Sequence, residues 1–153
     1  MPKITTFFMF DNQAEEAMKL YTSIFKNSRV VSTSPGPGGT VAGGTFILDG
    51  VEFSCYNAGA PDYFKIGMGI SISVSCDTQA EIDKYWEALS AGGEKQMCGW
   101  VKDKVGVSWQ IVPSILGQLL FDKDPAKAKR AIDAMLKMQK LDIQKLKDAH
   151  AGR

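Results

Sequence analysis

The chain has 153 residues, of which 44% are hydrophobic and 23% are charged, and its formal net charge is +1. This length and composition predict one ordinary globular domain, and the near-neutral charge gives no reason to expect nucleic acid or acidic lipid as a partner. No stretch predicts a signal peptide or a span across a bilayer, so no membrane association is expected. Three cysteines without CxxC spacing, Cys55, Cys76 and Cys98, favour free thiols and a cytoplasmic setting.

The first part of the chain predicts a strand, a helix and three further strands. Asp11 or Asn12 is expected to cap the helix, whose apolar residues recur at helical spacing through Tyr21. Pro35 to Gly39 predicts a flexible turn, and Asp49-Gly50 predicts a tight hairpin. The strands are predicted at residues 4–10, 30–33, 41–48 and 51–56.

The next part repeats this plan after a loop that begins at Asn57. Asp77 or Thr78 is expected to cap a helix, and Gly92-Gly93 is expected to end it. The strands are predicted at residues 69–76, 96–98, 100–103 and 107–113. The strand at 69–76 alternates apolar residues with serines, which predicts one small polar face.

Two pairs of segments repeat within the chain. Residues 11–15 are echoed at 77–81, an offset of 66 residues, and residues 50–56 are echoed at 106–112. Such a duplication predicts two copies of one module around a pseudo-twofold axis. Two curved sheets joined in this way are expected to enclose a cleft for a small molecule.

Residues 114–153 lie beyond the duplication and predict helices. Asp124-Pro125 is typical of a helix start, and Asp142 is expected to cap a last short helix. From Asp122 onward there are nine lysines and arginines against five acidic residues, which is typical of solvated helix faces and is also compatible with an acidic partner. These helices pack either on their own sheet or on a second subunit, and we favour a homodimer. The apolar stripe is predicted at Ala128, Ile132, Met135 and Leu136.

The segment from Gln96 to Pro113 carries a resemblance to a known family. Its Cys98-Gly99-Trp100 step, Asp103, Gly106 and the run 108–113 resemble the PhnB-like proteins, a branch of the vicinal oxygen chelate superfamily that includes glyoxalase I and bleomycin-resistance proteins. The resemblance implies an α+β fold of two βαβββ modules forming a cupped mixed sheet, commonly as homodimers. The modules are then residues 1–57 and 68–113 of a single domain, with a linker at 58–67 and a helical extension at 114–153.

Some relatives carry the label 3-demethylubiquinone-9 3-methyltransferase. A nucleotide-type methyl-donor site usually has a glycine-rich turn from a strand into a helix, followed by an acidic residue. The glycine-rich stretch here, Pro35 to Gly39, lies between two predicted strands. The sequence therefore gives no support for methyl transfer, and whether the protein is an enzyme stays open.

Metal-dependent members of the superfamily hold a divalent ion with histidines and glutamates on matching strands. The only histidine of this chain, His150, lies outside both modules, and Gln110 stands where metal-binding relatives have a glutamate. Its echo in the first module is Ser54. A neutral amide and a hydroxyl do not replace imidazole and carboxylate for a transition metal, so we expect no metal and no cofactor.

The remaining candidates are polar and aromatic residues of the expected cleft. Gln110 and Ser54 are expected to face each other, with Ser108 and Glu52 on the same strand faces. They either orient a small polar or aromatic ligand, or satisfy one another and water; Glu52 also fits a solvent-facing edge. Similarly, Trp100 and Trp109 form either an aromatic wall or part of the core.

Three functions fit these residues. The first is a binding protein of the bleomycin-resistance kind, in which a dimer holds a small molecule unchanged. The second is a metal-free isomerase or lyase with Glu52 or Asp103 as general base, although Asp103 also fits a turn-shaping role. The third is a structural or regulatory dimer with a vestigial cleft.

Overall fold

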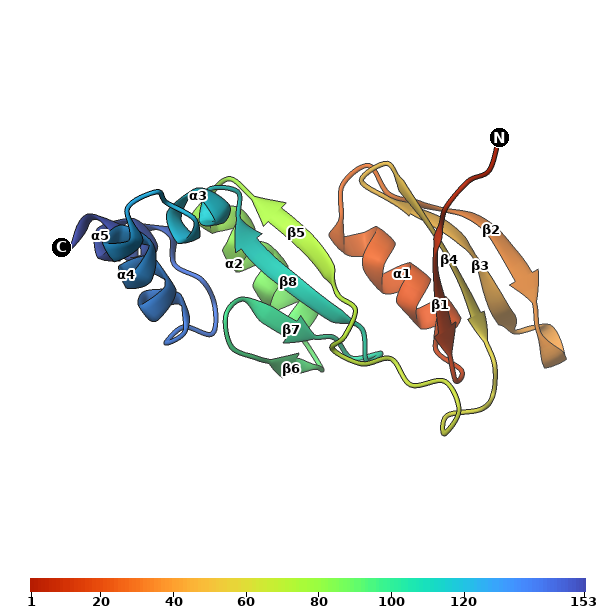
Figure 1. Cartoon of the computed structure of the whole chain (residues 1–153). Helices are drawn as coiled ribbons and strands as arrows, with labels where there is room; N and C mark the ends of the chain where they lie inside the picture. Colours follow the sequence, from red (N-terminus) through yellow and green to blue (C-terminus); the bar gives the residue numbers. More distant parts are fainter. The chain divides into compact units, whose positions relative to one another are not determined.

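The computed structural model describes all 153 residues, which form two compact units, residues 1–66 and 67–153 (Figure 1). Each unit contains a four-stranded mixed sheet and a helix that follows the first strand. The order of elements is strand, helix and three strands in both units, so the predicted α+β fold with two βαβββ modules is confirmed. A helical extension follows the second module.

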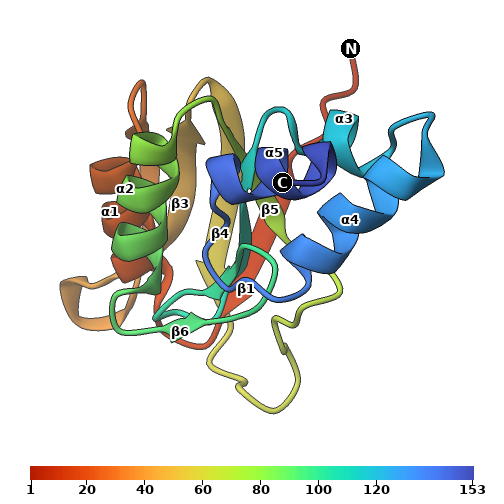
Figure 2. The same ribbon diagram turned by 90° about the vertical axis from the view of Figure 1, so that its left-hand side faces the viewer.

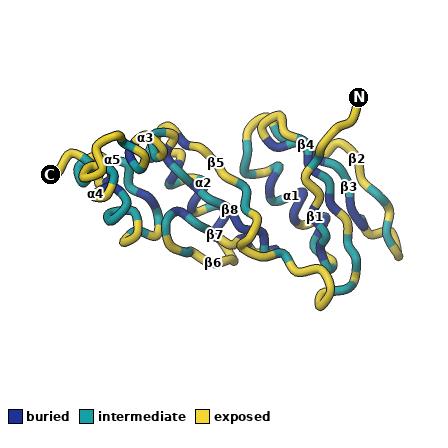
Figure 3. The backbone as a smooth tube through the Cα atoms, viewed as in Figure 1, coloured by how far each residue is buried: buried dark blue, intermediate teal, exposed yellow.

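The first sheet has the strand order β1-β4-β3-β2, with β1 parallel to β4 and the other pairs antiparallel. Its core lies between the sheet and α1, where Tyr21 of the helix contacts Phe46, and Phe46 stacks on Phe53 at 5.5 Å between ring centroids. Buried positions along α1, β3 and β4 mark this core in Figure 3. The elements are β1 (Thr6–Phe10), α1 (Ala14–Ile24), β2 (Arg29–Pro35), β3 (Val41–Leu48) and β4 (Val51–Asn57).

The second sheet repeats this topology with the order β5-β8-β7-β6, and β5 is again parallel to β8. Ile82, Trp86 and Leu89 of the helix are buried, as the helical spacing predicts. The elements are β5 (Ile72–Cys76), α2 (Gln79–Ser90), β6 (Glu94–Lys95), β7 (Trp100–Lys102) and β8 (Ser108–Pro113).

The strand predicted at residues 96–98 is wrong. The chain turns there, since the Gln96 N–H donates to the Trp100 carbonyl at 2.9 Å and the Trp100 N–H donates to the Met97 carbonyl at 3.1 Å. Cys98 and Gly99 both have positive φ, at 60° and 81°, which a strand does not allow. The edge strand β6 therefore lies two residues earlier.

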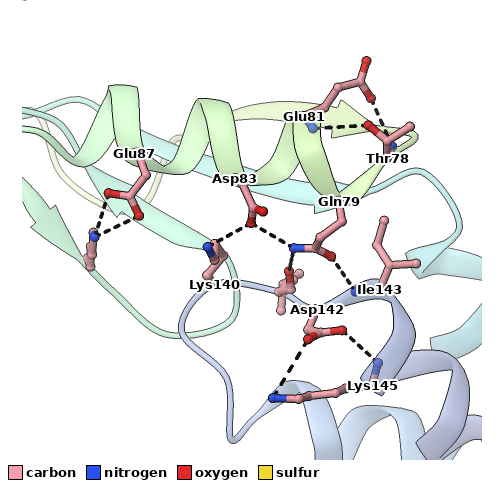
Figure 4. Close-up of polar contacts among 11 residues, drawn as sticks. Thr78, Gln79, Glu81, Asp83, Glu87, Lys140, Asp142, Ile143 and Lys145 are labelled. Carbon is pink, nitrogen blue, oxygen red and sulfur yellow. Dashed lines mark hydrogen bonds and ion pairs between the residues drawn. The ribbon is translucent and has the colours of Figure 1, made fainter.

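The two module helices begin differently despite their similar sequences. Thr78, one of the two caps that the sequence predicts, caps α2, and the structure adds a capping box with Glu81 (Figure 4). The cap predicted for α1 at Asp11 or Asn12 is wrong, because the helix starts after Gln13, which makes no side-chain cap. Instead, the Ala14 N–H donates to Asn57 Oδ1 at 2.8 Å, so an amide at the end of β4 caps α1.

The extension folds into three helices that contact one another, α3 (Leu116–Leu120), α4 (Pro125–Met135) and α5 (Ile143–Ala151), as Figure 2 shows. Asp124 and Asp142 cap α4 and α5, as predicted. The predicted stripe of α4 is only partly right, because Leu136 is 56% exposed and Ala131 is the fully buried residue. The buried cluster consists of Leu119, Ala131, Leu141 and Leu146. No helix of the chain is both long and apolar enough to span a membrane.

Candidate functional site

Strand β8 divides its side chains between two faces of the second sheet. Trp109 and Ile111 are buried, and α2 contacts this strand. Ser108 and Gln110 alternate with them and therefore lie on the opposite face, which we call the far face. The predicted pairing of Ser108 with Gln110 on one strand face agrees with this register.

A row of residues crosses the far face beside Gln110. Ser73 of β5 and Trp100 of β7 are its partners in the two flanking ladders, so the three side chains share one face. Gln110 is half-buried, and its Nε2 donates to the Ser71 hydroxyl at 2.8 Å. The structure therefore brings Gln110 and Trp100 together, as the sequence suggests, and adds Ser73 of β5 and Ser71, which directly precedes β5.

Trp109 lies on the face opposite Trp100. It is 1% exposed, and its Nε1 donates to Asp103 Oδ2 at 2.8 Å. Its ladder partner is Val101, which is also buried, whereas Trp100 pairs with Gln110. The hypothesis of one wall built from both tryptophans is therefore corrected, and Trp109 is a core residue.

Asp103 is a buried carboxylate that shapes the turn between β7 and β8. Its Oδ1 accepts hydrogen bonds from the Val105 and Val107 N–H groups at 3.0 and 2.9 Å, and its Oδ2 accepts from Trp109. A carboxylate used in this way organises the local backbone. The sequence left two roles open for Asp103, shaping the turn or acting as a general base, and this geometry matches the first.

Glu52 and Ser54 occupy the face of the first sheet opposite α1. They alternate along β4 with Phe53 and Cys55, both of which are buried. Ser54 Oγ lies 3.4 Å from the Thr45 hydroxyl of the neighbouring strand. Glu52 forms an ion pair with Lys3 at 2.8 Å and is partly exposed, but β4 lies between β1 and β3, so the residue faces solvent from an inner strand and not from an edge.

The side chains do not fit the divalent metal of the superfamily. No group of three or more His, Cys, Asp or Glu side chains is arranged to hold an ion. His150 lies within the extension, where its Nε2 is 2.9 Å from Asp122 Oδ2. The Gln110 amide is hydrogen-bonded to the Ser71 hydroxyl, and a neutral amide and a hydroxyl are poor ligands for a transition metal.

The two buried cysteines, Cys55 and Cys76, are not activated nucleophiles. Burial raises the pKa of the Cys55 thiol to about 11 and outweighs a hydrogen bond from the Gly44 backbone, which lowers it. Burial also raises the pKa of Cys76 to about 11, with further increases from the nearby Glu81 and Asp77 carboxylates. Both groups therefore remain protonated thiols near neutral pH, and thiolate chemistry has no support at either position.

The turns from strand to helix do not fit a nucleotide-type methyl donor. The β1–α1 turn is Asp11-Asn12-Gln13 and the β5–α2 turn is Asp77-Thr78, neither of which contains glycine. The glycine-rich segment forms a short 3-10 turn, Pro37–Gly39, between β2 and β3. No backbone cradle for phosphate or nucleotide is therefore formed where a methyl donor usually binds.

Comparisons with known proteins agree with this architecture. The chain is 39% identical to a PhnB protein from Bacillus cereus, covering 73% of this chain and 99% of that one, with a TM-score of 0.68. A protein from Pseudomonas aeruginosa is 23% identical over 74% of this chain and 98% of its own, with a TM-score of 0.61. The fosfomycin resistance protein FosX from Mesorhizobium loti, 14% identical over 72% of this chain and 89% of its own, shares the fold with a TM-score of 0.53. No curated protein matches the chain.

The family model described as 3-demethylubiquinone-9 3-methyltransferase matches residues 2–112. This range contains both modules and leaves α3, α4 and α5 outside the match. The resemblance that the segment from Gln96 to Pro113 suggested is thereby confirmed. The chain therefore belongs to this family, which we call PhnB-like after the Bacillus cereus protein.

Proposed function

We propose that this protein binds a small molecule on the far face of its second sheet, without a metal ion or cofactor. The observation that carries the proposal is the hydrogen bonding of the Gln110 side-chain amide. Its amide nitrogen is held by Ser71, and no protein group donates to its carbonyl oxygen. The amide is thus fixed in orientation with one acceptor available, which is how polar groups orient ligands in largely apolar sites.

The sequence-based expectation that Ser54 and Glu52 of the first module also contact a ligand stays a prediction. Binding is favoured over an isomerase or lyase reaction because both candidate bases are already engaged. Glu52 is paired with Lys3, and Asp103 accepts three hydrogen bonds. A general base needs a free acceptor that reaches the substrate proton.

A fragment screen by two-dimensional NMR tests the binding face. We expect fragments to move the Gln110 side-chain amide signals together with the backbone signals of Ser73 and Trp100. Replacing Gln110 with Leu should weaken such fragments about five- to tenfold, the usual cost of one hydrogen bond in a partly buried site. Gln118→Leu, an exposed glutamine in α3, is the matched control. Unchanged affinity in Gln110→Leu eliminates this face and favours the vestigial-cleft hypothesis.

We also infer a homodimer to which the extension contributes. Leu136 is 56% exposed and Phe121 is 84% exposed, and large exposed side chains of this kind are enriched in contacts between subunits. Light scattering of the full chain should give the mass of two chains, and Leu136→Asp should shift it toward one. Lys147→Asp, an exposed change on α5, should leave the dimer intact. A dimer that survives Leu136→Asp contradicts the role of the extension.

A cytoplasmic location is part of the same proposal. Cys55, Cys76 and Cys98 are all free, and reduced thiols are typical of the cytosol.

A further inference from the structure

We propose that the ligand is a planar aromatic molecule without negative charge, seated at Trp100, and that the C-terminal extension supplies one wall of its site. This inference rests on the proposed binding face and adds the class of ligand. Its basis is a hollow of about 520 Å³ at the β6–β7 edge of the second sheet. The lining residues that matter for the argument are Met68, Gln96, Met97, Cys98, Trp100 and Gln139.

The hollow continues the row that contains Gln110. Trp100 pairs with Gln110 across β7 and β8, so both side chains lie on the far face. On the side of Trp100 away from β8 lies Gln96. The backbone N–H of Gln96 donates to the Trp100 carbonyl at 2.9 Å. The half-buried indole therefore stands between two amide side chains, one of them held by Ser71.

The walls favour an aromatic ligand over an aliphatic one. A ring can stack on the Trp100 indole, which gives more than the burial of area alone. Met68 and Met97 are 53% and 47% exposed, and thioethers make favourable contacts with aromatic rings while adapting to their shape. The volume is within the range of small-molecule pockets.

The charges around the hollow disfavour an anionic ligand. Lys95 forms an ion pair with Glu87, in which the lysine Nζ lies 3.1 and 3.2 Å from the two carboxylate oxygens. Glu94 accepts from Gln96 Nε2 at 3.4 Å. The Lys95 charge is therefore neutralised by Glu87, whereas the only partner of Glu94 is a neutral amide, so an anionic ligand would find no unpaired cation at the hollow.

Gln96 offers an acceptor to a ligand hydroxyl or N–H. Its Nε2 faces Glu94 Oε1 and Met68 Sδ, the latter at 3.8 Å, while its Oε1 is buried and has no hydrogen-bond partner. A buried acceptor without a donor is unfavourable, so a ligand that donates a hydrogen bond to this oxygen should bind more tightly. Met68 is unbranched and exposed, and can move aside to admit one.

The extension is fastened to this hollow. The Cys98 and Gly99 N–H groups donate to the Met138 and Gln139 carbonyls at 2.8 and 2.7 Å. The loop that follows is held by Gln79 of α2, whose Nε2 donates to the Leu141 carbonyl and whose Oε1 accepts from the Ile143 N–H, at 3.0 and 2.9 Å (Figure 4). Gln139 is thereby placed in the wall. The family match ends at residue 112, so this wall lies outside the shared modules and gives this chain its own selectivity.

A comparison of phenol with cyclohexanol tests the ligand class. Each molecule has one hydroxyl and six carbons, and only phenol is aromatic. The chain has three tryptophans, and their indole N–H signals in two-dimensional NMR are separate probes. We expect phenol to shift the Trp100 signal saturably and to leave those of the buried Trp86 and Trp109 in place. Cyclohexanol should bind about fivefold more weakly, because it cannot stack on the indole. Equal affinity of the two, or no shift of Trp100 by phenol, overturns the proposal.

Two variants test the amide and the extension. Gln96→Met keeps the length of the side chain and removes the acceptor, and should weaken phenol about fivefold. Gln139→Ala should weaken phenol about threefold by removing wall contacts, whereas Gln144→Ala, an exposed change on α5, should not. Equal affinity in Gln139→Ala and Gln144→Ala overturns the role of the extension. If fragments move Gln110 while phenol leaves Trp100 unmoved, this inference fails and the binding face stands; if no probe moves either residue, both fail.

Discussion

Single side chains in β8 have roles that depend on which face of the sheet they occupy. Trp109 and Gln110 are neighbours in sequence, yet one is buried in the core and the other lies on the far face. Asp103 illustrates the same dependence, since its carboxylate accepts hydrogen bonds from two backbone N–H groups of the turn and from the Trp109 indole. The chemistry available to a residue therefore follows from its register as much as from its type.

Asp103→Asn tests the turn. The amide nitrogen of asparagine replaces one acceptor oxygen, so at least one of the three donors loses its partner in a buried site. We expect the free energy of unfolding to fall by about 2 kcal/mol, the usual cost of an unsatisfied buried donor. Urea denaturation measures this. Asp133→Asn, which removes a surface pairing with Lys129, should change stability by less than about 0.5 kcal/mol, and similar losses in both variants would contradict the assignment.

Among the elements, α2 is the attachment point of the extension. Gln79 in its first turn binds the backbone at Leu141 and Ile143, and Asp83 one turn later binds Lys140 at 2.8 Å (Figure 4). Gln79 also donates to Asp83 Oδ1 at 3.1 Å, so the two contacts form one network. The loop before α5 is therefore held by side chains of a module helix.

This network predicts a pH dependence of stability. Hydrogen bonds from Lys140 and then from Gln79 lower the pKa of Asp83 below 3.8, the ordinary aspartate value. A carboxylate with a lowered folded-state pKa stabilises the protein fully above that ordinary value, and this stabilisation is lost as the pH falls through the folded-state pKa. Asp83→Asn should therefore be less stable than wild type near neutral pH, and the difference should shrink below about pH 4.

Chemical denaturation of both proteins at a series of pH values gives this comparison. Glu87→Gln, on the same helix, pairs with Lys95 and not with the extension, and serves as the control. A difference between wild type and Asp83→Asn that stays constant down to about pH 2, where aspartate titration is nearly complete, would contradict the assigned contacts.

At the scale of the whole molecule, the chain consists of two units with separate cores. The first unit packs α1 against Phe46 and Phe53, and the second packs α2 against Trp109 and Ile111. All three tryptophans lie in the second unit. Tryptophan fluorescence therefore reports on one unit, while circular dichroism reports on both.

Phe46→Ala uses this asymmetry. Phe46 is fully buried, and truncating such a ring should destabilise the first unit by about 3–5 kcal/mol. We expect the circular dichroism transition to begin at lower denaturant while the fluorescence transition stays in place, because the second unit keeps its own core. Coincident shifts in both signals would show that the two units unfold together.

Local sequence determined the repeated modules of this protein. Alternation in the strand that precedes α2, helical spacing in α1 and α2, and the cap at Thr78 all arise from residues a few positions apart. The echoes of residues 11–15 at 77–81 and of residues 50–56 at 106–112 predict two similar modules. The face shared by Ser108 and Gln110 follows from the same two-residue period.

Only the tertiary structure decided the features made by residues far apart in the chain. The cap of α1 comes from Asn57, 43 residues away, and Gln79 binds backbone groups 62 and 64 residues away. The hollow at Trp100 likewise joins Met68, the turn at residues 96–100 and Gln139 of the extension. Local preferences do not encode such contacts, because they form only when packing brings distant segments together.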